Sequence, residues 1–170
     1  YLRANHNELG IDPDRIGITG NSAGGHLSLM AGLKDYDKDF EGEGGHNEVN
    51  SQVKAICAIY PPAKIRKIEN TDPIIDAYRM LMGEADQEEY NKASPLLQIK
   101  TDFPPTMLVH GSSDSVVRLE DSTDLYKKLK EENIPAELHI FSEEDHAFDS
   151  ARGYGRSVAE LQHLFFKKYL

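Results

Sequence analysis

Short apolar runs alternate with amphipathic stretches along most of the chain. Runs of this kind are typical of strands that are buried on both faces. We predict strands at 15–20, 53–60, 105–110 and 136–142. Apolar residues recur at helical spacing between and after these runs. We predict helices at 23–33, about 119–132 and about 154–168. The alternation indicates an α/β fold, with a mostly parallel sheet covered by helices on both faces.

A G-x-S-x-G motif, Gly20 to Gly24, lies between the first predicted strand and the first predicted helix. This arrangement is the nucleophile elbow of an α/β-hydrolase, in which a sharp turn exposes the serine, here Ser22. We expect both flanking glycines to lack a side chain because of that turn. The alternative is that Ser22 caps the helix, since serine is favoured at that position. The surrounding motif favours the nucleophile.

Two further candidates follow strands in the order that the hydrolase fold requires. Asp114 lies in the loop after 105–110, and His146 follows 136–142. Both are expected at the carboxyl edge of the sheet, where ligands bind in open parallel sheets. Competing acids are Asp102, Asp121, Asp145 and Asp149, of which Asp149 is expected to be solvated. Competing bases are His26, His110 and His139, which we expect to be structural.

Three segments carry a resemblance to a known family. They are Gly-Asn-Ser-Ala-Gly-Gly-His-Leu at 20–27, the strand and acid loop at 104–117, and Asp-His-Ala-Phe at 145–148. Together they resemble the acetyl-xylan-esterase-like carboxylesterases of the α/β-hydrolase superfamily over nearly all 170 residues. That family usually has glycine where Ala147 stands. The resemblance implies ester hydrolysis through a serine acyl-enzyme, without a cofactor.

The resemblance also implies a role for each site residue. Ser22 would be the nucleophile, His146 the general base, and Asp114 the acid that orients the imidazole. The backbone N–H of Ala23 would donate to the oxyanion hole. The acidic run 143–145 has no His or Cys spacing beside it that would indicate a metal site, and we expect a solvated loop there.

Enzymes of the resembled family are nearly twice as long. Their N-terminal half carries further strands and a His-Gly-Gly-Gly type loop, and neither is found in this sequence. The chain opens on Tyr1, and its first ten residues resemble the tail of a helix that stops at Gly10. We therefore interpret the chain as the C-terminal part of one α/β-hydrolase domain. A strand edge without its neighbour would favour pairing with a second copy, so we expect a homo-oligomer.

The interval from about 61 to 100 fits the alternation less well and is interpreted as a small lid-like insertion. We expect short helices at about 73–83 and about 87–93, ended by Ser94 and Pro95. In the resembled family this interval helps to shape the acyl pocket. Its apolar residues would either line such a pocket or pack the lid onto the core, and we favour packing for each of them. These residues are Ile74, Ile75, Tyr78, Met80, Leu81 and Met82. Residues 37–50 are expected to form a mobile surface loop.

Composition excludes several classes of partner. The 19 basic and 29 acidic residues leave a net charge of −10. This balance argues against binding to nucleic acid or to anionic membrane surfaces. No apolar run approaches the length of a transmembrane helix. The single cysteine, Cys57, excludes an internal disulfide and favours a cytoplasmic location.

Three functional hypotheses remain. The first is a serine carboxylesterase that acts on short acyl esters, acetyl esters in particular, including those on carbohydrate. The second is a serine peptidase of the prolyl oligopeptidase type, although that group usually has tyrosine where this chain has His26. The third is a catalytically incomplete fragment that acts as an assembly unit.

Overall fold

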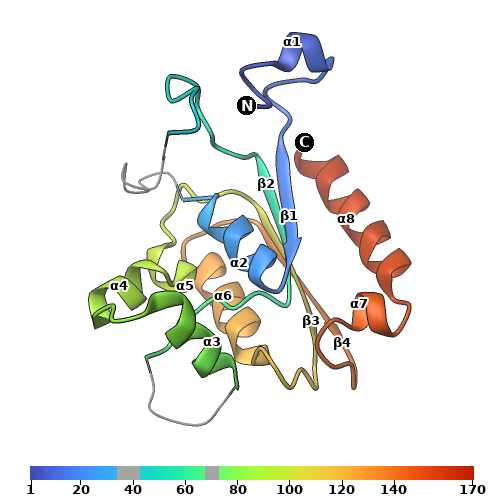
Figure 1. Ribbon diagram of the computed structural model, residues 1–170. Helices are drawn as coiled ribbons and strands as arrows, with labels where there is room; N and C mark the ends of the chain where they lie inside the picture. The colour runs from blue at the N-terminus through green and yellow to red at the C-terminus, as the bar shows by residue number, and fades with distance from the viewer. Residues whose placement is uncertain (34–42, 68–72) are drawn as a thin grey trace.

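The sheet forms as the alternation predicts. The computed structural model describes residues 1–33, 43–67 and 73–170 (Figure 1). Four strands pair in the order β1-β2-β3-β4, and every pair is parallel. Their bounds are β1 (Gly17–Asn21), β2 (Ala55–Ile59), β3 (Thr106–Gly111) and β4 (Ala136–Phe141). The predicted fold class is confirmed. Part of the predicted loop at 37–50 lies outside the described residues.

The three predicted long helices are also present, as α2 (Ala23–Met30), α6 (Leu119–Glu131) and α8 (Gly155–Tyr169). Helix α2 ends before its predicted end at 33, where Gly32 lies against the side chains of Ile56 and Phe103. Short helices that the periodicity did not resolve are α1 (His6–Leu9), α5 (Pro95–Gln98) and α7 (Phe148–Ala151). Gly10 caps α1 in the left-handed conformation, as a glycine stop requires.

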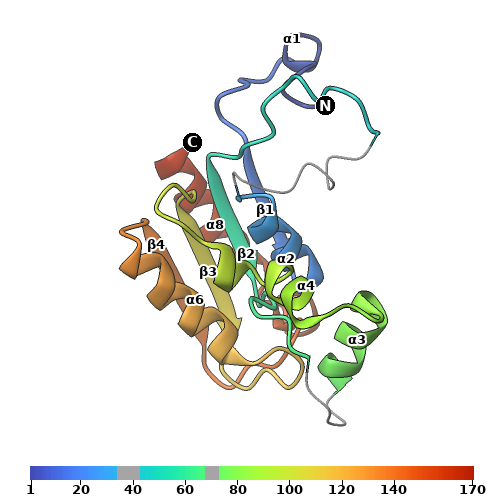
Figure 2. The same cartoon turned by 90° about the vertical axis from the view of Figure 1, so that its left-hand side faces the viewer.

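Side chains of β2 alternate between two cores because successive residues of a strand point to opposite faces. Ile56 and Ala58 join a cluster with residues of α2 and α6. Ala55, Cys57 and Ile59 join a second cluster with residues of α7 and α8. Figures 1 and 2 show α2 and α6 on one side of the sheet and α8 on the other. Helices on both faces explain why β2 and β3 are buried along their whole length.

The lid-like segment has its own small core. It contains α3 (Pro73–Met82) and α4 (Gln87–Lys92), which begins with a capping box between Asp86 and Glu89. Tyr78 and Tyr90 are buried against Ile65. Helix α4 ends just before Ser94 and Pro95, as predicted, and Pro95 also occupies the first turn of α5, where its missing N–H has no cost.

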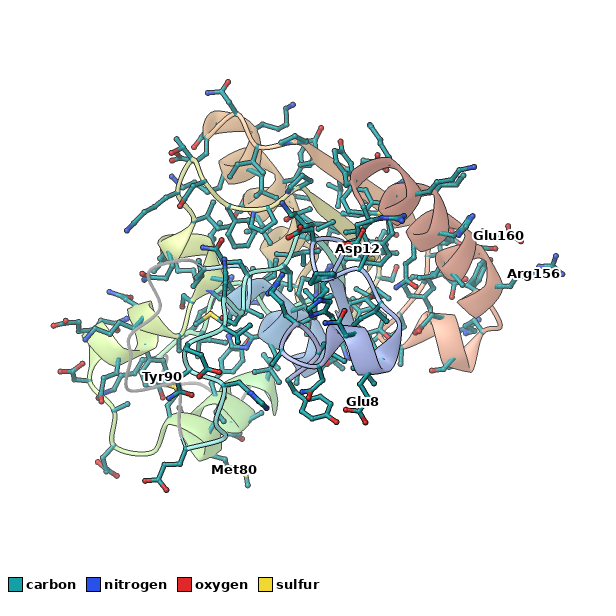
Figure 3. The ribbon with its side chains drawn as sticks, turned by 90° about the horizontal axis from the view of Figure 1, so that it is seen from above. Glu8, Asp12, Met80, Tyr90, Arg156 and Glu160 are labelled. Carbon is teal, nitrogen blue, oxygen red and sulfur yellow. The ribbon has the colours of Figure 1, made fainter. Side chains whose placement is uncertain are left out.

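The apolar residues of α3 divide between two faces. Ile74, Tyr78 and Met82 recur four apart and pack into the lid core. Met80 and Leu81 are exposed, and Figure 3 shows Met80 pointing outward from α3. The side chain of Ile75 lies outside the described part of the chain. Three of these residues therefore pack as expected, although within the lid's own cluster and not onto the main core. The expectation of packing is wrong for Met80 and Leu81.

The elbow between β1 and α2 requires a glycine at one of its two flanking positions but not at the other. A Cβ at Gly20 would lie 2.4 Å from backbone atoms of Gly24, whereas a Cβ at Gly24 would meet nothing within 4 Å. The prediction that both flanking glycines must lack a side chain is thus correct for Gly20 and wrong for Gly24. The second close approach is at Gly25, whose Cβ would lie 3.1 Å from the Ile59 carbonyl oxygen.

Within the described ranges, β1 lies at an edge of the sheet and pairs with β2 alone. Leu27 on α2 and Leu164 on α8 are exposed. Homo-oligomer formation through a strand edge stays a prediction. No helix in the described ranges combines the length and apolar character needed to cross a bilayer.

Truncation of Leu125 should destabilise the fold far more than truncation of Leu164. Leu125 is 0% exposed inside the core between α6 and the sheet, and Leu164 is 65% exposed. Leu125→Ala should lower the free energy of unfolding by about 2–5 kcal/mol, because it leaves a cavity. Leu164→Ala should change it by about 0.5 kcal/mol or less. Urea unfolding measures both, and equal losses would contradict the assigned core.

Alanine substitutions at the elbow should separate the two glycines. Gly20→Ala should cost about 1–3 kcal/mol of unfolding free energy, because its methyl group overlaps the backbone at Gly24. Gly24→Ala should be neutral or stabilising by up to about 1 kcal/mol, since alanine is the better helix former. Urea unfolding of both variants is the measurement. A Gly24→Ala protein as unstable as Gly20→Ala would refute this view of the turn.

Candidate active site

Ser22 stands at the tip of the elbow in an unusual backbone conformation. Its φ is 53° and its ψ is −121°, between the end of β1 and the start of α2. Its amide donates to the Ile59 carbonyl at 2.9 Å, which fixes the turn against the end of β2. The side chain makes no capping hydrogen bond to α2. The helix-cap alternative for Ser22 is therefore wrong.

The Ser22 hydroxyl instead faces His146. Its Oγ lies 2.9 Å from His146 Nε2, across 124 positions of sequence. The other ring nitrogen, Nδ1, lies 2.8 Å from Asp114 Oδ2. The structure thus brings the three predicted site residues into one hydrogen-bonded chain. Ala147, which follows His146, has a φ of 58°. That left-handed conformation explains why glycine is usual there in the resembled family.

Asp114 is held as a carboxylate by several donors. Its side chain is 0% exposed. Burial alone would raise the pKa of Asp114, but hydrogen bonds from His110, His146 and the amides of Val117 and Val116 lower it well below its usual range. The two amides donate to Oδ1 at 2.8 and 2.9 Å. Asp114 is therefore ionised at neutral pH.

His110 is a contact of Asp114 that sequence reasoning missed. It was expected to be structural, and it is fully buried at the end of β3. Its Nε2 lies 3.3 Å from Asp114 Oδ2 and 3.0 Å from the Val117 carbonyl oxygen. Two acceptors on one nitrogen mean that Nε2 carries a proton, and Nδ1 lies 2.7 Å from the Ser122 hydroxyl, from which it accepts when the imidazole is neutral. The only available signal was its place at a strand end.

The side chains of the other candidate histidines have partners other than Ser22. His26 Nε2 lies 2.8 Å from the Ala93 carbonyl oxygen, which ties α2 to the end of α4. Burial lowers the pKa of His26, and the hydrogen bond to Ala93 opposes that effect. His139 lies within β4, 3.3 Å from Glu137. Both are structural, as predicted.

Two competing acids have identifiable structural partners. Asp121 is buried and pairs with Arg66 at 2.9 Å. Asp145 is exposed; its Oδ1 accepts from the Ser115 amide and hydroxyl and from the His146 amide. These hydrogen bonds lower the pKa of Asp145 and hold the acidic loop close to the Asp114 loop. Asp102 precedes β3 and so lies near the amino ends of the strands, opposite the carboxyl ends that carry Ser22 and His146.

Asp149 is not the solvated loop carboxylate that the sequence suggested. It lies in α7, is half-buried, and its Oδ1 accepts a 2.5 Å hydrogen bond from the Tyr60 hydroxyl. The Tyr60 ring packs on the His146 imidazole, with ring centroids 4.6 Å apart. Sequence reasoning missed Tyr60 because this residue is simply the last one of an apolar run and belongs to no motif.

Ala23 is the first residue of α2 and is exposed beside Ser22. Its N–H is one of the first four of the helix, which have no intrahelical acceptor and lie at the positive end of the helix dipole. A developing negative charge next to Ser22 would be stabilised there. Within the described residues, no group of three or more His, Cys, Asp or Glu side chains is placed to hold a metal ion.

Comparisons with known proteins identify the family and the fold of this chain. The BD-FAE family model matches residues 1–129, which include Ser22 and Asp114. The chain is 31% identical over 96% of its length to the probable carboxylic ester hydrolase LipM of Mycobacterium tuberculosis, of which it covers 40%.

Two solved structures share the fold. An acetyl ester-xyloside bifunctional hydrolase from Caldicellulosiruptor lactoaceticus aligns with a TM-score of 0.80 at 30% identity, over 98% of this chain and 61% of that one. A truncated carbohydrate esterase from gut microbiota aligns with a TM-score of 0.79 at 26% identity, over 99% of this chain and 64% of that one.

The chain thus spans about 40% of the curated relative and about three fifths of the solved structures. The family model covers most of the chain, and the fold of nearly the whole chain aligns with that of a solved hydrolase. The chain therefore belongs to the BD-FAE family and has the α/β-hydrolase fold.

Proposed function

We propose that this chain carries the catalytic triad of a carboxylic ester hydrolase. The observation behind the proposal is the continuous hydrogen-bonded chain from Ser22 through His146 to the buried Asp114. A serine hydroxyl is a weak nucleophile at its own pKa and needs a base within hydrogen-bond reach. His146 Nε2 meets that requirement at 2.9 Å. In this proposal Ser22 is the nucleophile, His146 the base, and Asp114 the residue that orients it.

The reaction follows from these positions. Ser22 Oγ attacks the acyl carbonyl carbon while its proton passes to His146 Nε2. The tetrahedral intermediate then expels the alcohol, which takes that proton from the imidazolium and leaves an acyl group on Ser22. In the second half, water gives a proton to Nε2 and attacks the acyl carbon. The bond from that carbon to Ser22 Oγ then breaks, Oγ takes the proton back from the imidazolium, and the carboxylic acid is released. Asp114 keeps the proton of Nδ1 in place and stabilises the imidazolium throughout.

The Ala23 N–H would donate to the oxyanion that forms in each half of the reaction. Removal of one such donor typically slows a reaction by about 10²–10³. The sequence contains no His-Gly-Gly-Gly segment of the kind that supplies a second donor in the resembled enzymes. We therefore expect this chain alone to react more slowly than a chain with that loop.

The substrate class is proposed to be short acyl esters, acetyl esters in particular, including those on carbohydrate. The names of the relatives support esters over amides, and two of the aligned structures are named for acetyl ester or carbohydrate substrates. They give no support to the peptidase alternative. A comparison of acetyl esters with prolyl amides as substrates separates the two classes.

Covalent labelling tests the nucleophile. A fluorophosphonate should add once to the folded chain, because its phosphorus meets the activated Ser22 Oγ as an acyl carbon would. Intact mass should show a single adduct on the wild type and none on Ser22→Ala. Ser28→Ala removes another hydroxyl, which donates to the Gly24 carbonyl within α2, and should leave the labelling in place. A folded wild-type chain that forms no adduct would favour the assembly-unit hypothesis.

The charge of Asp114 generates a second prediction. Asp114→Asn should reduce the labelling rate by about 10⁴, because an amide favours the wrong imidazole tautomer. The folded-state pKa of Asp114 lies below its unfolded value of about 3.9. Its contribution to stability is therefore complete above that value and is lost as pH falls toward the folded pKa.

The measurement is the unfolding free energy of wild type and Asp114→Asn between about pH 6 and pH 3. The difference in unfolding free energy between wild type and Asp114→Asn should be constant near about pH 6 and should shrink as the pH falls below about 4. An advantage that is independent of pH would contradict the ionised, hydrogen-bonded carboxylate.

A further inference from the structure

Tyr60 occupies a central position among the strand ends, although the mechanism above gives it no role. It follows β2 directly, is 1% exposed and has a φ of 38°. Its amide donates to the Val109 carbonyl at 2.6 Å, next to the bond from Ser22 to Ile59. A non-glycine residue at positive φ persists only where its surroundings hold it, and such residues gather at functional sites.

The Tyr60 hydroxyl joins two segments that flank the triad. It donates to Asp149 Oδ1 at 2.5 Å and accepts from Asn21 Nδ2 at 3.0 Å. Asn21 immediately precedes the nucleophile, and Asp149 lies three residues after the base. One buried hydroxyl therefore links the end of β1 to the histidine loop. Both hydrogen bonds are intramolecular, so the hydroxyl has a donor and an acceptor without water.

The Tyr60 ring makes the third contact. It packs on the His146 imidazole at 4.6 Å between centroids, with 57° between the ring planes. The imidazole thus contacts the Tyr60 ring, Asp114 through Nδ1 and Ser22 through Nε2. Burial raises the pKa of Tyr60, and the hydrogen bond to Asp149 raises it further. The phenol therefore stays protonated and remains a donor to Asp149.

We propose that Tyr60 is a positioning residue for the reaction of Ser22: its ring and its hydroxyl bond to Asp149 hold His146 in line with the nucleophile. This inference rests on the proposed function. It adds a contact of Tyr60 with His146 and Asp149, which neither the elbow motif nor the order of Ser22, Asp114 and His146 predicts. Asp149 lies in α7, which begins two residues after His146. The hydrogen bond from Tyr60 to Asp149 therefore restrains the backbone that carries the imidazole. Displacement of a base by about 1 Å can cost about 10² in rate.

The test is a double-mutant cycle on the labelling rate. Tyr60→Phe keeps the ring and removes the hydroxyl, and Asp149→Ala removes its acceptor. Each should slow fluorophosphonate labelling by about 10- to 100-fold in folded protein. The double variant should be no slower than the slower single variant, because both changes break the same bond. Tyr126→Phe is the control, since Tyr126 packs against the core on the opposite face of the sheet.

Steady-state kinetics on an acetyl ester adds a readout that a merely structural role would not move. The loss should fall on kcat, with KM changed less than threefold, since the substrate need not touch Tyr60. Unchanged kcat in Tyr60→Phe at a temperature where the variant is fully folded would overturn the inference. Losses that multiply in the double variant would overturn it as well.

Nuclear magnetic resonance of the His146 ring separates this inference from the proposed function. A wild-type chain that does not label refutes the proposed function, yet its ring nitrogens still report hydrogen bonding to Asp114 and Ser22. Tyr60→Phe should move both nitrogen shifts toward those of a free histidine, whereas Tyr126→Phe should leave them unchanged. Identical shifts in wild type and Tyr60→Phe would overturn the positioning role, whatever the labelling shows.

Discussion

Parallel pairing of the four strands is the constraint on which the site depends. Parallel strands all end at the same edge, so Ser22, Tyr60, Asp114 and His146 meet although they follow four different strands. Strands β2 and β3 are buried throughout and carry cores on both faces. The turn that carries Ser22 is bonded to the end of β2 through the Ile59 carbonyl. This frame accompanies the 2.9 Å distance between Ser22 and His146, which are 124 positions apart in sequence.

The same edge holds a buried negative charge. A carboxylate out of water is costly unless donors replace its hydration, and Asp114 receives two backbone amides and two imidazoles. This arrangement explains the buried pair of His110 and Ser122, which supplies one of those donors from β3 and α6. A carboxylate held in this way keeps its charge near His146 without moving, which is the condition for preorganised electrostatic stabilisation.

Backbone strain is concentrated in the same place. Ser22, Tyr60 and Ala147 all have positive φ, and each follows or lies close to a strand end beside the triad. Such conformations persist because the surrounding hydrogen bonds fix them. The amide of Ser22 bonds to the end of β2, and that of Tyr60 bonds to β3. Turns with unusual backbone conformations thus surround Ser22 and His146, in addition to the regular elements.

The amino-acid sequence by itself determined the four strands, the three long helices, the parallel arrangement and the three residues that the structure joins by hydrogen bonds, Ser22, Asp114 and His146. Buried strands, amphipathic helices and an elbow leave clear local signals, and the strand order places their carboxyl ends together. Only the tertiary structure decided which glycine the elbow requires, which α3 residues face outward, and that Asp149 bonds to Tyr60. It also revealed that His110 supports Asp114. These features depend on distances between residues far apart in sequence, and no periodicity or motif in one chain encodes such distances locally.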